Sequence, residues 1–311
     1  MRILITGGAG CLGSNIVERY LPLGHEICVI DNFATSKREL LSDTPNVSLL
    51  EGSVADSAVV NKAFAEFEPT HVIHSAAAYK DPNDWAEDDQ TNVLGAINVA
   101  SAANDHAVKR LINFQTALCY GIPERVPVPV SHPVAPITSY GISKSAGEAY
   151  IMQAQVPTIS LRLANICGPR LAIGAIPTFY KRLSAKQECF CSKVVRDFLD
   201  MSDFLALMDI VLVPGAATGV FNVSTGAGNS IREVFDEVAS YLGLPDLDVP
   251  EVEPGIDDIP AVVLDPTETE KAFGWKAQVG FRETLGRQLQ WYDKNGISET
   301  YSHLRGPGRD D

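Results

Sequence analysis

The sequence predicts an α/β protein with a doubly wound parallel sheet and a smaller C-terminal domain. Over the first half of the chain, short apolar runs rich in β-branched residues alternate with stretches of helical character. This alternation is typical of a parallel sheet whose two faces are both covered by helices. Beyond about residue 165 the alternation gives way to pieces punctuated by proline and glycine, which indicate a second, smaller domain.

The apolar runs of the first half are the expected strands of this sheet. In chain order they are residues 2–6, 26–31, 46–52, 70–76, 110–116 and 158–164. A further run, residues 219–224, is expected to add a strand to the same sheet. We therefore expect one domain over residues 1–165, joined by strand 219–224, and a second mainly over residues 166–300. The polar, turn-rich residues 301–311 are expected to form a disordered tail.

Composition and charge argue against several classes of protein. The chain has 311 residues, 45% of them hydrophobic and 21% charged, with a formal net charge of −14. Nucleic-acid binding depends on clustered lysine and arginine, so this charge argues against such a partner. No run approaches the roughly 18 apolar residues of a membrane span. The opening segment MRILITGG is typical of a strand rather than a signal peptide, so we expect a cytoplasmic protein without a membrane partner.

Cysteine and histidine usage gives little sign of special chemistry. The six cysteines are scattered, with Cys189 and Cys191 as the one close pair, and we expect reduced thiols. His74 ends an apolar run and is expected to be a core residue. No His or Cys cluster has the spacing of metal ligands, so no metal is expected.

The first expected strand leads directly into the glycine-rich segment GGAGCLGS. Gly7, Gly10 and Gly13 recur at three-residue spacing where a helix is expected to begin. Glycines let the backbone turn tightly and approach a ligand, and the amides at a helix N-terminus attract negative charge. The segment predicts a pyrophosphate site, with a simple tight turn as the alternative.

Asp31 ends the second expected strand, where a carboxylate can accept hydrogen bonds from a ribose 2′-hydroxyl. A carboxylate at this place repels a 2′-phosphate, so the pattern favours NAD over NADP. Lys37 and Arg38, a few residues later, are the features that favour NADP. The alternative is that Asp31 is an ordinary turn residue.

Tyr140 and Lys144 in the segment SYGISK are four residues apart. They share one helical face if Thr138 or Ser139 caps a helix there. A tyrosine with a pKa near 10 is a poor base at neutral pH, and a neighbouring ammonium together with a positive cofactor ring lowers that pKa. The alternative is an exposed Tyr–Lys pair that meets by chance.

Taken together, these motifs resemble those of a known family. They occur in the order seen in the extended short-chain dehydrogenase/reductases, and the sequence is most similar to the nucleotide-sugar epimerases of bacterial O-antigen (lipopolysaccharide) clusters. The resemblance covers nearly the whole chain. Beside the glycine segment, Asp31 and YGISK, it is carried by HSAA (74–77), TNVLGAIN (91–98), FQT (114–116), LRLANICGPR (161–170), RDFLDMSDF (196–204), FNVSTG (221–226) and KAFGWK (271–276).

The resemblance implies a Rossmann domain that binds NAD and a second domain that binds a nucleotide-diphosphate sugar. It implies that Tyr140 is the base at the sugar O4, that Lys144 holds the nicotinamide ribose and lowers the pKa of the tyrosine, and that Thr116 is their hydroxyl partner. It also implies a homodimer formed through the helices that contain TNVLGAIN and YGISK. The implied cofactor-binding residues are Gly7, Gly10, Cys11, Leu12, Gly13, Asp31, Asn32, Ser53, Val54, Ser75, Ala76, Ala77, Tyr140 and Lys144.

The residues after Thr116 narrow the reaction that the resemblance implies. Related dehydratases carry an acidic pair immediately after the threonine, and related decarboxylases carry a glutamate at the second position, whereas this chain has Ala117 and Leu118. The remaining reaction needs no other acid: oxidation at C4 by NAD⁺, rotation of the 4-keto sugar and return of the hydride to the other face. We therefore expect a UDP-sugar 4-epimerase in surface polysaccharide biosynthesis. A 4,6-dehydratase or a 4-keto-sugar reductase is the alternative enzyme, and a dinucleotide-binding sensor is the alternative outside enzymes.

On the substrate side, the resemblance implies that Thr116, Asn165 and Arg196 bind the nucleotide sugar. Lys80 could reach a phosphate or a sugar carboxylate, with a solvated loop lysine as the alternative. For Arg196 the alternative is a structural pair with Asp197.

Two positions depart from the family pattern. Relatives usually supply a diphosphate-clamping arginine near residues 253–258, but no Lys or Arg occurs here between Arg232 and Lys271. One of three cations would have to replace it: Arg170, Lys181 or Arg182. Ser53 stands where relatives often have an aspartate that contacts adenine, which puts that contact in doubt.

Overall fold

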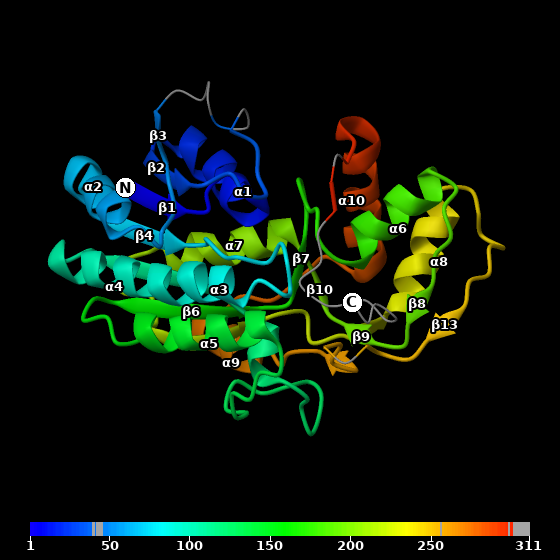
Figure 1. Cartoon of the computed structure of the whole chain (residues 1–311). Helices are drawn as coiled ribbons and strands as arrows, with labels where there is room; N and C mark the ends of the chain where they lie inside the picture. Colours follow the sequence, from blue (N-terminus) through cyan, green and yellow to red (C-terminus); the bar gives the residue numbers. More distant parts are fainter. Residues whose placement is uncertain (39–40, 42–45, 256, 298, 301–311) are drawn as a thin grey trace.

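The chain forms two lobes, one built on a large parallel sheet and a smaller one beside it (Figure 1). The computed structural model describes residues 1–38, 41, 46–255, 257–297 and 299–300. The predicted tail, residues 301–311, lies outside the described residues. No helix in the described part of the chain is both long and apolar enough to cross a bilayer.

In the described residues the large sheet has seven strands in the order β11-β6-β5-β4-β1-β2-β3. Every neighbouring pair is parallel. The strands are β1 (Arg2–Thr6), β2 (Glu26–Asp31), β3 (Val47–Glu51), β4 (His71–His74), β5 (Arg110–Thr116), β6 (Thr158–Leu163) and β11 (Gly219–Val223). Each of the predicted runs contains one of these strands, so the predicted α/β class with a doubly wound Rossmann sheet is confirmed.

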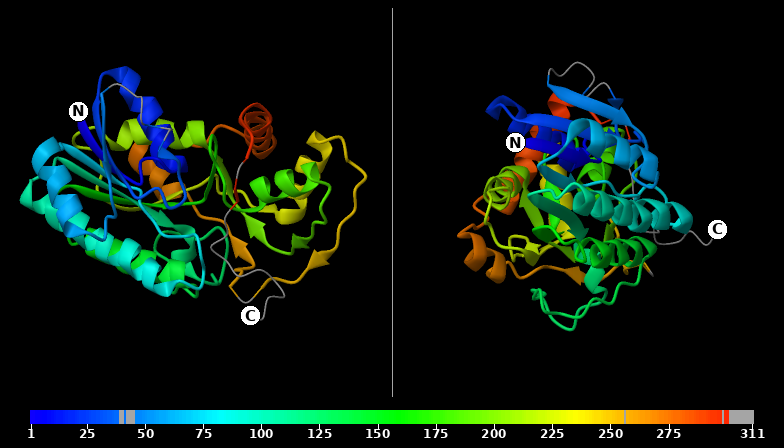
Figure 2. Two further views of the ribbon diagram at one scale, coloured as in Figure 1. Left: turned by 45° about the horizontal axis from the view of Figure 1, so that its top comes forward. Right: turned by 90° about the vertical axis from the view of Figure 1, so that its left-hand side faces the viewer.

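Helices cover both faces of the sheet (Figure 2). They are α1 (Cys11–Tyr20) and α7 (Met201–Val211) on one face, and α2 (Ser57–Phe67), α4 (Gly95–Asp105) and α5 (Ser139–Ile151) on the other. Ile3 and Ile5 of β1 pack in one core with Phe204 of α7. Leu4, between them in the sequence, packs in the other core with Val99 of α4. This is the alternation of a strand that is buried on both faces.

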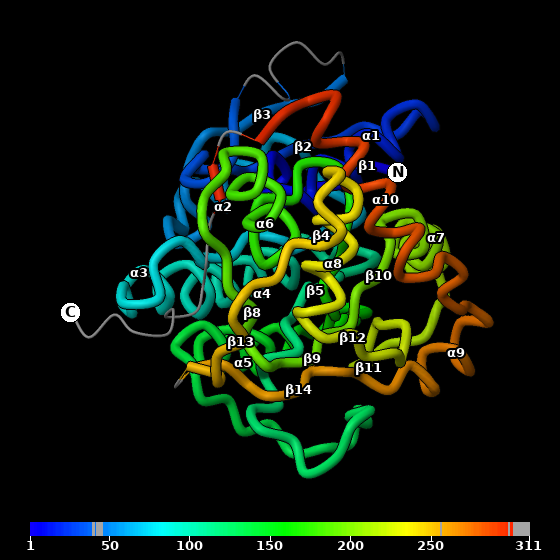
Figure 3. Tube along the Cα trace, turned by 90° about the vertical axis from the view of Figure 1, so that its right-hand side faces the viewer, coloured from blue at the N-terminus to red at the C-terminus, as the bar shows by residue number. Residues whose placement is uncertain are grey.

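The smaller lobe packs three helices around its own apolar core (Figure 3). They are α6 (Ala175–Ser184), α8 (Ile231–Tyr241) and α10 (Phe281–Asn295). Phe179 of α6 meets Phe235 of α8 edge to face, with ring centroids 5.3 Å apart. The short strands are β7 (Asn165–Cys167), β8 (Cys191–Ser192), β9 (Val195–Arg196), β10 (Phe198–Asp200), β12 (Asn229–Ser230), β13 (Glu251–Val252) and β14 (Ala261–Val262).

The chain crosses between the lobes more than once after residue 165. Helix α7 and strand β11 lie with the large sheet, because the apolar face of α7 is buried in the same core as β1. Phe273 of α9 packs on Phe221 of β11, with ring centroids 4.9 Å apart. The division into a cofactor domain and a substrate domain stays a prediction. Helices α7 and α9 and strand β11, which follow residue 165, lie with the large sheet. The remaining short helices are η1 (Leu21–Leu23), α3 (Trp85–Asp88), η3 (Asp89–Leu94), η4 (Ala117–Tyr120) and α9 (Thr267–Phe273).

Candidate active site

A cavity of about 900 Å³ lies at the carboxyl ends of β1, β2, β4 and β5 and continues to the smaller lobe. Clefts at this edge of an open parallel sheet are the usual ligand sites of such folds. The predicted site residues that line it are Gly7, Gly10, Cys11, Leu12, Asp31, Asn32, Ser53, Val54, Ser75, Ala76, Ala77, Lys80, Thr116, Tyr140, Lys144, Asn165 and Arg196. Gly13 is not among the lining residues.

The glycine loop is shaped for close approach of a ligand and of neighbouring backbone. Gly7 has φ +66°, and a Cβ there would lie 2.8 Å from the Cα of Ala76. A Cβ on Gly13 would lie 2.4 Å from the carbonyl oxygen of Gly7, so Gly13 allows α1 to pack against the turn. Helix α1 has Gly10 as its N-cap and no side-chain cap, and Gly10, Cys11 and Leu12 line the cavity. The first amides of a helix have no partner within it, so this cradle fits a pyrophosphate such as that of NAD.

Asp31 is buried and holds two loops together. Its carboxylate accepts hydrogen bonds from the amide of Ala9 at 2.9 Å, the amide of Phe33 at 2.8 Å and the hydroxyl of Ser36 at 3.0 Å. It also lines the cavity, so both the turn role and the ribose role fit its position. Arg38, which could have favoured a 2′-phosphate, forms an ion pair with Glu51.

The three predicted catalytic residues, Thr116, Tyr140 and Lys144, line the same cavity. Thr116 ends β5, and its hydroxyl accepts a hydrogen bond from the amide of Leu118 at 3.2 Å. Tyr140 and Lys144 lie in the first turns of α5, whose N-cap is Thr138: its hydroxyl accepts from the amide of Gly141 at 3.0 Å. Thr138, of the two proposed caps, is therefore the N-cap.

Burial shifts the pKa values of this pair in opposite directions. It lowers the pKa of Lys144 to about 8, an effect that the nearby Glu148 carboxylate partly offsets. Burial also raises the pKa of Tyr140, and Tyr79 and Asp88 raise it further. Tyr140 is therefore a neutral phenol in the protein alone, and its use as a base depends on the positive charge of a bound cofactor.

The cavity is poor in acids beside Thr116 but not elsewhere. Ala117 and Leu118 both line it, as the sequence requires. The cavity lining, however, also includes Asp88, which is buried at the end of α3 and accepts a hydrogen bond of 2.6 Å from Ser139. The lack of acids at the two positions after Thr116 therefore does not extend to the whole cavity. The sequence signal was the acidic run around residues 81–89, which resembles a solvated surface segment.

Arg196 lines the cavity with a partner that the sequence did not indicate. It forms an ion pair with Asp258 and donates to the carbonyl oxygen of Ile259 at 2.7 Å. Asp197 instead accepts hydrogen bonds from Thr225 and Gly226. The alternative of a structural Arg–Asp pair for Arg196 is therefore met by Asp258 and not by Asp197. Burial raises the pKa of Asp197 to about 6.

The cations proposed to replace the missing arginine differ in whether they line the cavity. Arg170 forms a bidentate ion pair with Glu18, with N–O distances of 2.7 and 2.8 Å, and does not line the cavity. Arg182 of α6 does line it, and its Nε donates to the carbonyl oxygen of Glu188 at 2.7 Å. Within the described residues, Arg182 and Arg196 are the arginines of the cavity wall.

Lys80 lines the cavity, whereas His74 does not. Lys80 is exposed at the cavity rim, and its Nζ lies 3.4 Å from the carbonyl oxygen of Ala34 in the loop after β2. It therefore lies at the predicted cofactor side. His74 is buried outside the cavity lining, as expected of a core residue. One ring nitrogen contacts the hydroxyl of Thr6 at 2.8 Å, and the other has no partner in the described part of the chain.

A profile of the "NAD dependent epimerase/dehydratase family" matches residues 3–224, which is more than half of the chain. The chain belongs to this family. The predicted resemblance and the predicted dependence on NAD are thereby confirmed. No group of three potential metal ligands is present among the described residues, and the expected absence of a metal stays a prediction.

Individual members of the epimerase/dehydratase family match over nearly the full length. The chain is 29% identical to a UDP-glucose 4-epimerase of Mycolicibacterium smegmatis, over 94% of this chain and 98% of that one. It superposes on the Bordetella bronchiseptica enzyme WbmG, solved with NAD and UDP, with a TM-score of 0.92 and 65% identity over 98% of both chains. For WbmH of the same organism, solved with NAD⁺, the TM-score is 0.89 and the identity 41%, over 95% of this chain and 99% of that chain.

Proposed function

We propose that this family member is an NAD-dependent 4-epimerase of a UDP-linked sugar that serves bacterial surface polysaccharide synthesis. The observation that carries the proposal is one cavity that joins the glycine loop and Asp31 to Thr116, Tyr140 and Lys144. The relatives named UDP-glucose 4-epimerase and the structure of WbmG with NAD and UDP support the reaction and the carrier nucleotide.

In this reaction Tyr140 accepts the proton of the sugar O4 and returns it to the epimer. The hydroxyl of Thr116 hydrogen-bonds the same oxygen, and the ammonium of Lys144 holds the ribose and stabilises the phenolate of Tyr140. When bound, NAD⁺ supplies a reversible acceptor for the hydride at C4. Because the proton and the hydride both return to the sugar, no net oxidant or reductant is consumed.

The side chains beside Thr116 favour epimerisation over dehydration. Loss of water across C5 and C6 needs a base at C5 and an acid at O6. Ala117 and Leu118 can supply neither. Asp88 is the buried carboxyl that favours the dehydratase alternative, but it already accepts the hydrogen bond of Ser139.

Arg182 and Arg196 are proposed to face the diphosphate of the nucleotide, with Asn165 beside them. All three line the part of the cavity formed with the smaller lobe. A guanidinium is suited to phosphate because its planar N–H groups bind two oxygens at once. This pair takes the place of the arginine that relatives supply near residue 253.

A homodimer through η3, α4 and α5 is also proposed. Helices α4 and α5 pack side by side on one face of the sheet. Three large apolar residues of these elements are exposed: Leu94 at the end of η3 by 42%, and Ile142 and Tyr150 of α5 by 54% and 49%. Exposed large apolar residues on packed helices are a feature of many interfaces, which supports the proposal. The enzyme is proposed to work in the cytoplasm, where NAD⁺ and UDP-sugars are available.

The test is proton NMR of UDP-glucose, UDP-N-acetylglucosamine and their uronic acids, each incubated with the enzyme and NAD⁺ but without reductant. We expect one of these sugars to relax to a mixture with its C4 epimer, with the total sugar unchanged. A product that has lost water indicates the dehydratase instead. Turnover of 4-keto sugars alone, and only with NADH, indicates the reductase, and NAD binding without any turnover indicates the sensor.

A further inference from the structure

We propose that Gln115 is a positioning residue, whose side-chain amide ties Thr116 at the end of β5 to Lys144 in α5. This inference rests on the proposed function, because Thr116 and Lys144 are catalytic only in that reaction. The side chain of Gln115 is 2% exposed, so its amide must find partners within the protein.

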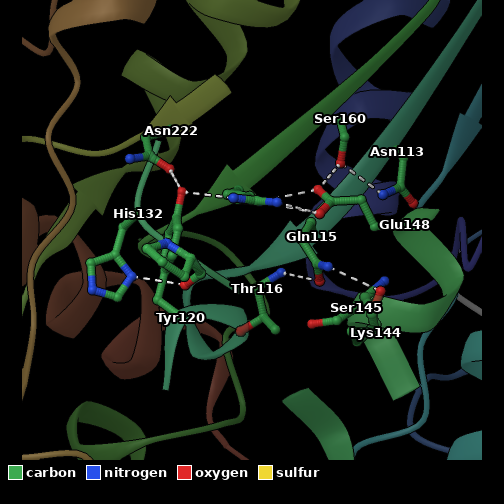
Figure 4. A network of polar contacts seen from close by, with 12 residues as sticks. Asn113, Gln115, Thr116, Tyr120, His132, Lys144, Ser145, Glu148, Ser160 and Asn222 are labelled. Atoms are coloured by element: carbon green, nitrogen blue, oxygen red, sulfur yellow. Dashed lines mark hydrogen bonds and ion pairs between the residues drawn. The ribbon is translucent and has the colours of Figure 1, made fainter. Parts of the chain in front are cut away.

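The two ends of the Gln115 amide bind two different parts of the site (Figure 4). Its Nε2 donates to the backbone carbonyl of Lys144 at 3.0 Å, and its Oε1 accepts from the backbone amide of Thr116 at 2.7 Å. Gln115 is adjacent to Thr116 in the chain but 29 residues from Lys144. One planar group therefore sets the distance between the strand end and the catalytic helix.

A second buried contact, one turn further along α5, makes this tie effective. The carboxylate of Glu148 forms an ion pair with Arg162 at 2.7 Å and accepts from Ser160 at 2.6 Å, both in β6. Arg162 also donates to the hydroxyl of Tyr120 at 3.0 Å. Gln115 and Glu148 are thus two buried side-chain contacts, one turn apart along α5, that join this helix to the neighbouring strands β5 and β6.

The catalytic groups depend on that fixed geometry. Thr116 and Tyr140 must meet the same sugar oxygen, and a misplacement of about 1 Å at a reacting group can reduce the rate about a hundredfold. Gln115 itself lines the cavity, but both ends of its amide are already bonded within the protein. Its contribution is to hold the Thr116 hydroxyl and the Tyr140–Lys144 face of α5 in register.

The principal variant is Gln115→Met, which keeps the length of the side chain and removes both hydrogen bonds. Thr158→Val is the matched control: Thr158 begins β6, is also buried and donates to the carbonyl oxygen of Val156 at 2.9 Å, but touches neither Thr116 nor Lys144. We expect kcat of Gln115→Met to fall about tenfold with KM within about twofold, since a loss of 1.4 kcal/mol in the transition state is tenfold in rate. Equal losses of kcat in the two variants would overturn the proposal.

Gln115→Glu adds a second test, the pH dependence of kcat, which a merely structural role of Gln115 would not change. A protonated carboxyl group can still donate to the carbonyl of Lys144, whereas an ionised one repels it. The ratio of its kcat to that of the wild type should therefore be higher at pH 6 than at pH 8. A ratio that does not change with pH contradicts a role for the hydrogen bond to Lys144.

A measurement without sugar separates this inference from the proposed function. The ionisation of Tyr140 in the NAD-loaded protein is followed by ultraviolet difference titration, with Tyr140→Phe as the baseline. We expect Gln115→Met to raise this pKa by about half a unit, a threefold change, and Thr158→Val to leave it unchanged. If no sugar is epimerised, the proposed function fails while this titration still decides the role of Gln115. An unshifted Gln115→Met titration refutes that role even in an active epimerase.

Discussion

The hydroxyl of Ser139 donates a hydrogen bond of 2.6 Å to the carboxylate of Asp88, which brings a buried acid next to the first turn of α5. Burial raises the pKa of Asp88, and the hydrogen bond from Ser139 opposes that shift. The carboxylate in turn raises the pKa of Tyr140. The charge of Asp88 thus opposes the ionisation of Tyr140.

Asp88→Asn should therefore make Tyr140 a stronger acid. An asparagine can still accept the hydrogen bond from Ser139, but it carries no charge. We expect the acidic limb of the kcat/KM profile to move down by about half a unit to one unit, because the phenolate forms at lower pH. The control is Asp84→Asn, since Asp84 also lines the cavity but caps α3 through the amide of Glu87. An equal shift in both variants would mean that general cavity charge, not Asp88, sets the profile.

Tyr140→Phe should abolish turnover and leave NAD bound. The phenol has a proton-transfer role in the proposed reaction, and loss of a general base costs about a hundredfold to ten-thousandfold in rate. The ring itself keeps its packing beside the cofactor site. Turnover is followed by NMR of the sugar and NAD content by release on denaturation. A Tyr140→Phe protein with near-normal turnover removes Tyr140 as the base.

The sheet and the cofactor loop could be predicted because their signals are local in the sequence. Strands β1, β2 and β5 begin and end at the predicted residues, since a short continuous apolar run and its flanking turns are visible in a short window. The glycine spacing likewise indicates a cradle that depends on neighbouring residues only.

The supporting contacts of the site could not be predicted, because they join residues that are far apart in the chain. Asp258 pairs with Arg196 over 62 residues, and Ser139 binds Asp88 over 51 residues. The role of Gln115 needs the relative position of a strand and a helix. A single sequence carries no signal for such pairings, so the structure was needed to find them.

Lys144→Met should stabilise the protein at neutral pH while it destroys activity. The pKa of Lys144 is lowered from 10.5 to about 8 in the folded state, so below pH 8 folding carries the full cost of burying the ammonium. Each unit of that shift corresponds to about 1.4 kcal/mol, and we expect Lys144→Met to raise the free energy of unfolding at pH 7 by about 1–3 kcal/mol.

The stability advantage of Lys144→Met should shrink as the pH rises. Between pH 8 and 10.5 the unfolded chain holds the Lys144 proton and the folded protein releases it, so the wild type gains stability relative to Lys144→Met as the pH rises. Urea denaturation of both proteins at pH 7 and at pH 10 measures the difference. Two results contradict the cost of burying the ammonium: a Lys144→Met variant that is less stable than the wild type at pH 7, or a stability advantage of the variant that grows with pH.

Thr35→Val should make the protein release NAD faster. The hydroxyl of Tyr79, after β4, lies 3.0 Å from the hydroxyl of Thr35, after β2, and Lys80 reaches the carbonyl oxygen of Ala34 beside it. These residues line the cavity, so the contacts join two loops across the predicted cofactor groove. A valine keeps the shape and removes one hydrogen bond, worth about 1 kcal/mol or roughly a fivefold change in a rate constant.

We expect NAD dissociation from Thr35→Val to speed up by about that factor in a displacement assay, with kcat unchanged at saturating NAD⁺. Thr35→Ser keeps the hydroxyl and should dissociate NAD at the wild-type rate. If Thr35→Ser loses NAD as fast as Thr35→Val, packing of the methyl group, and not the bridge to Tyr79, retains the cofactor.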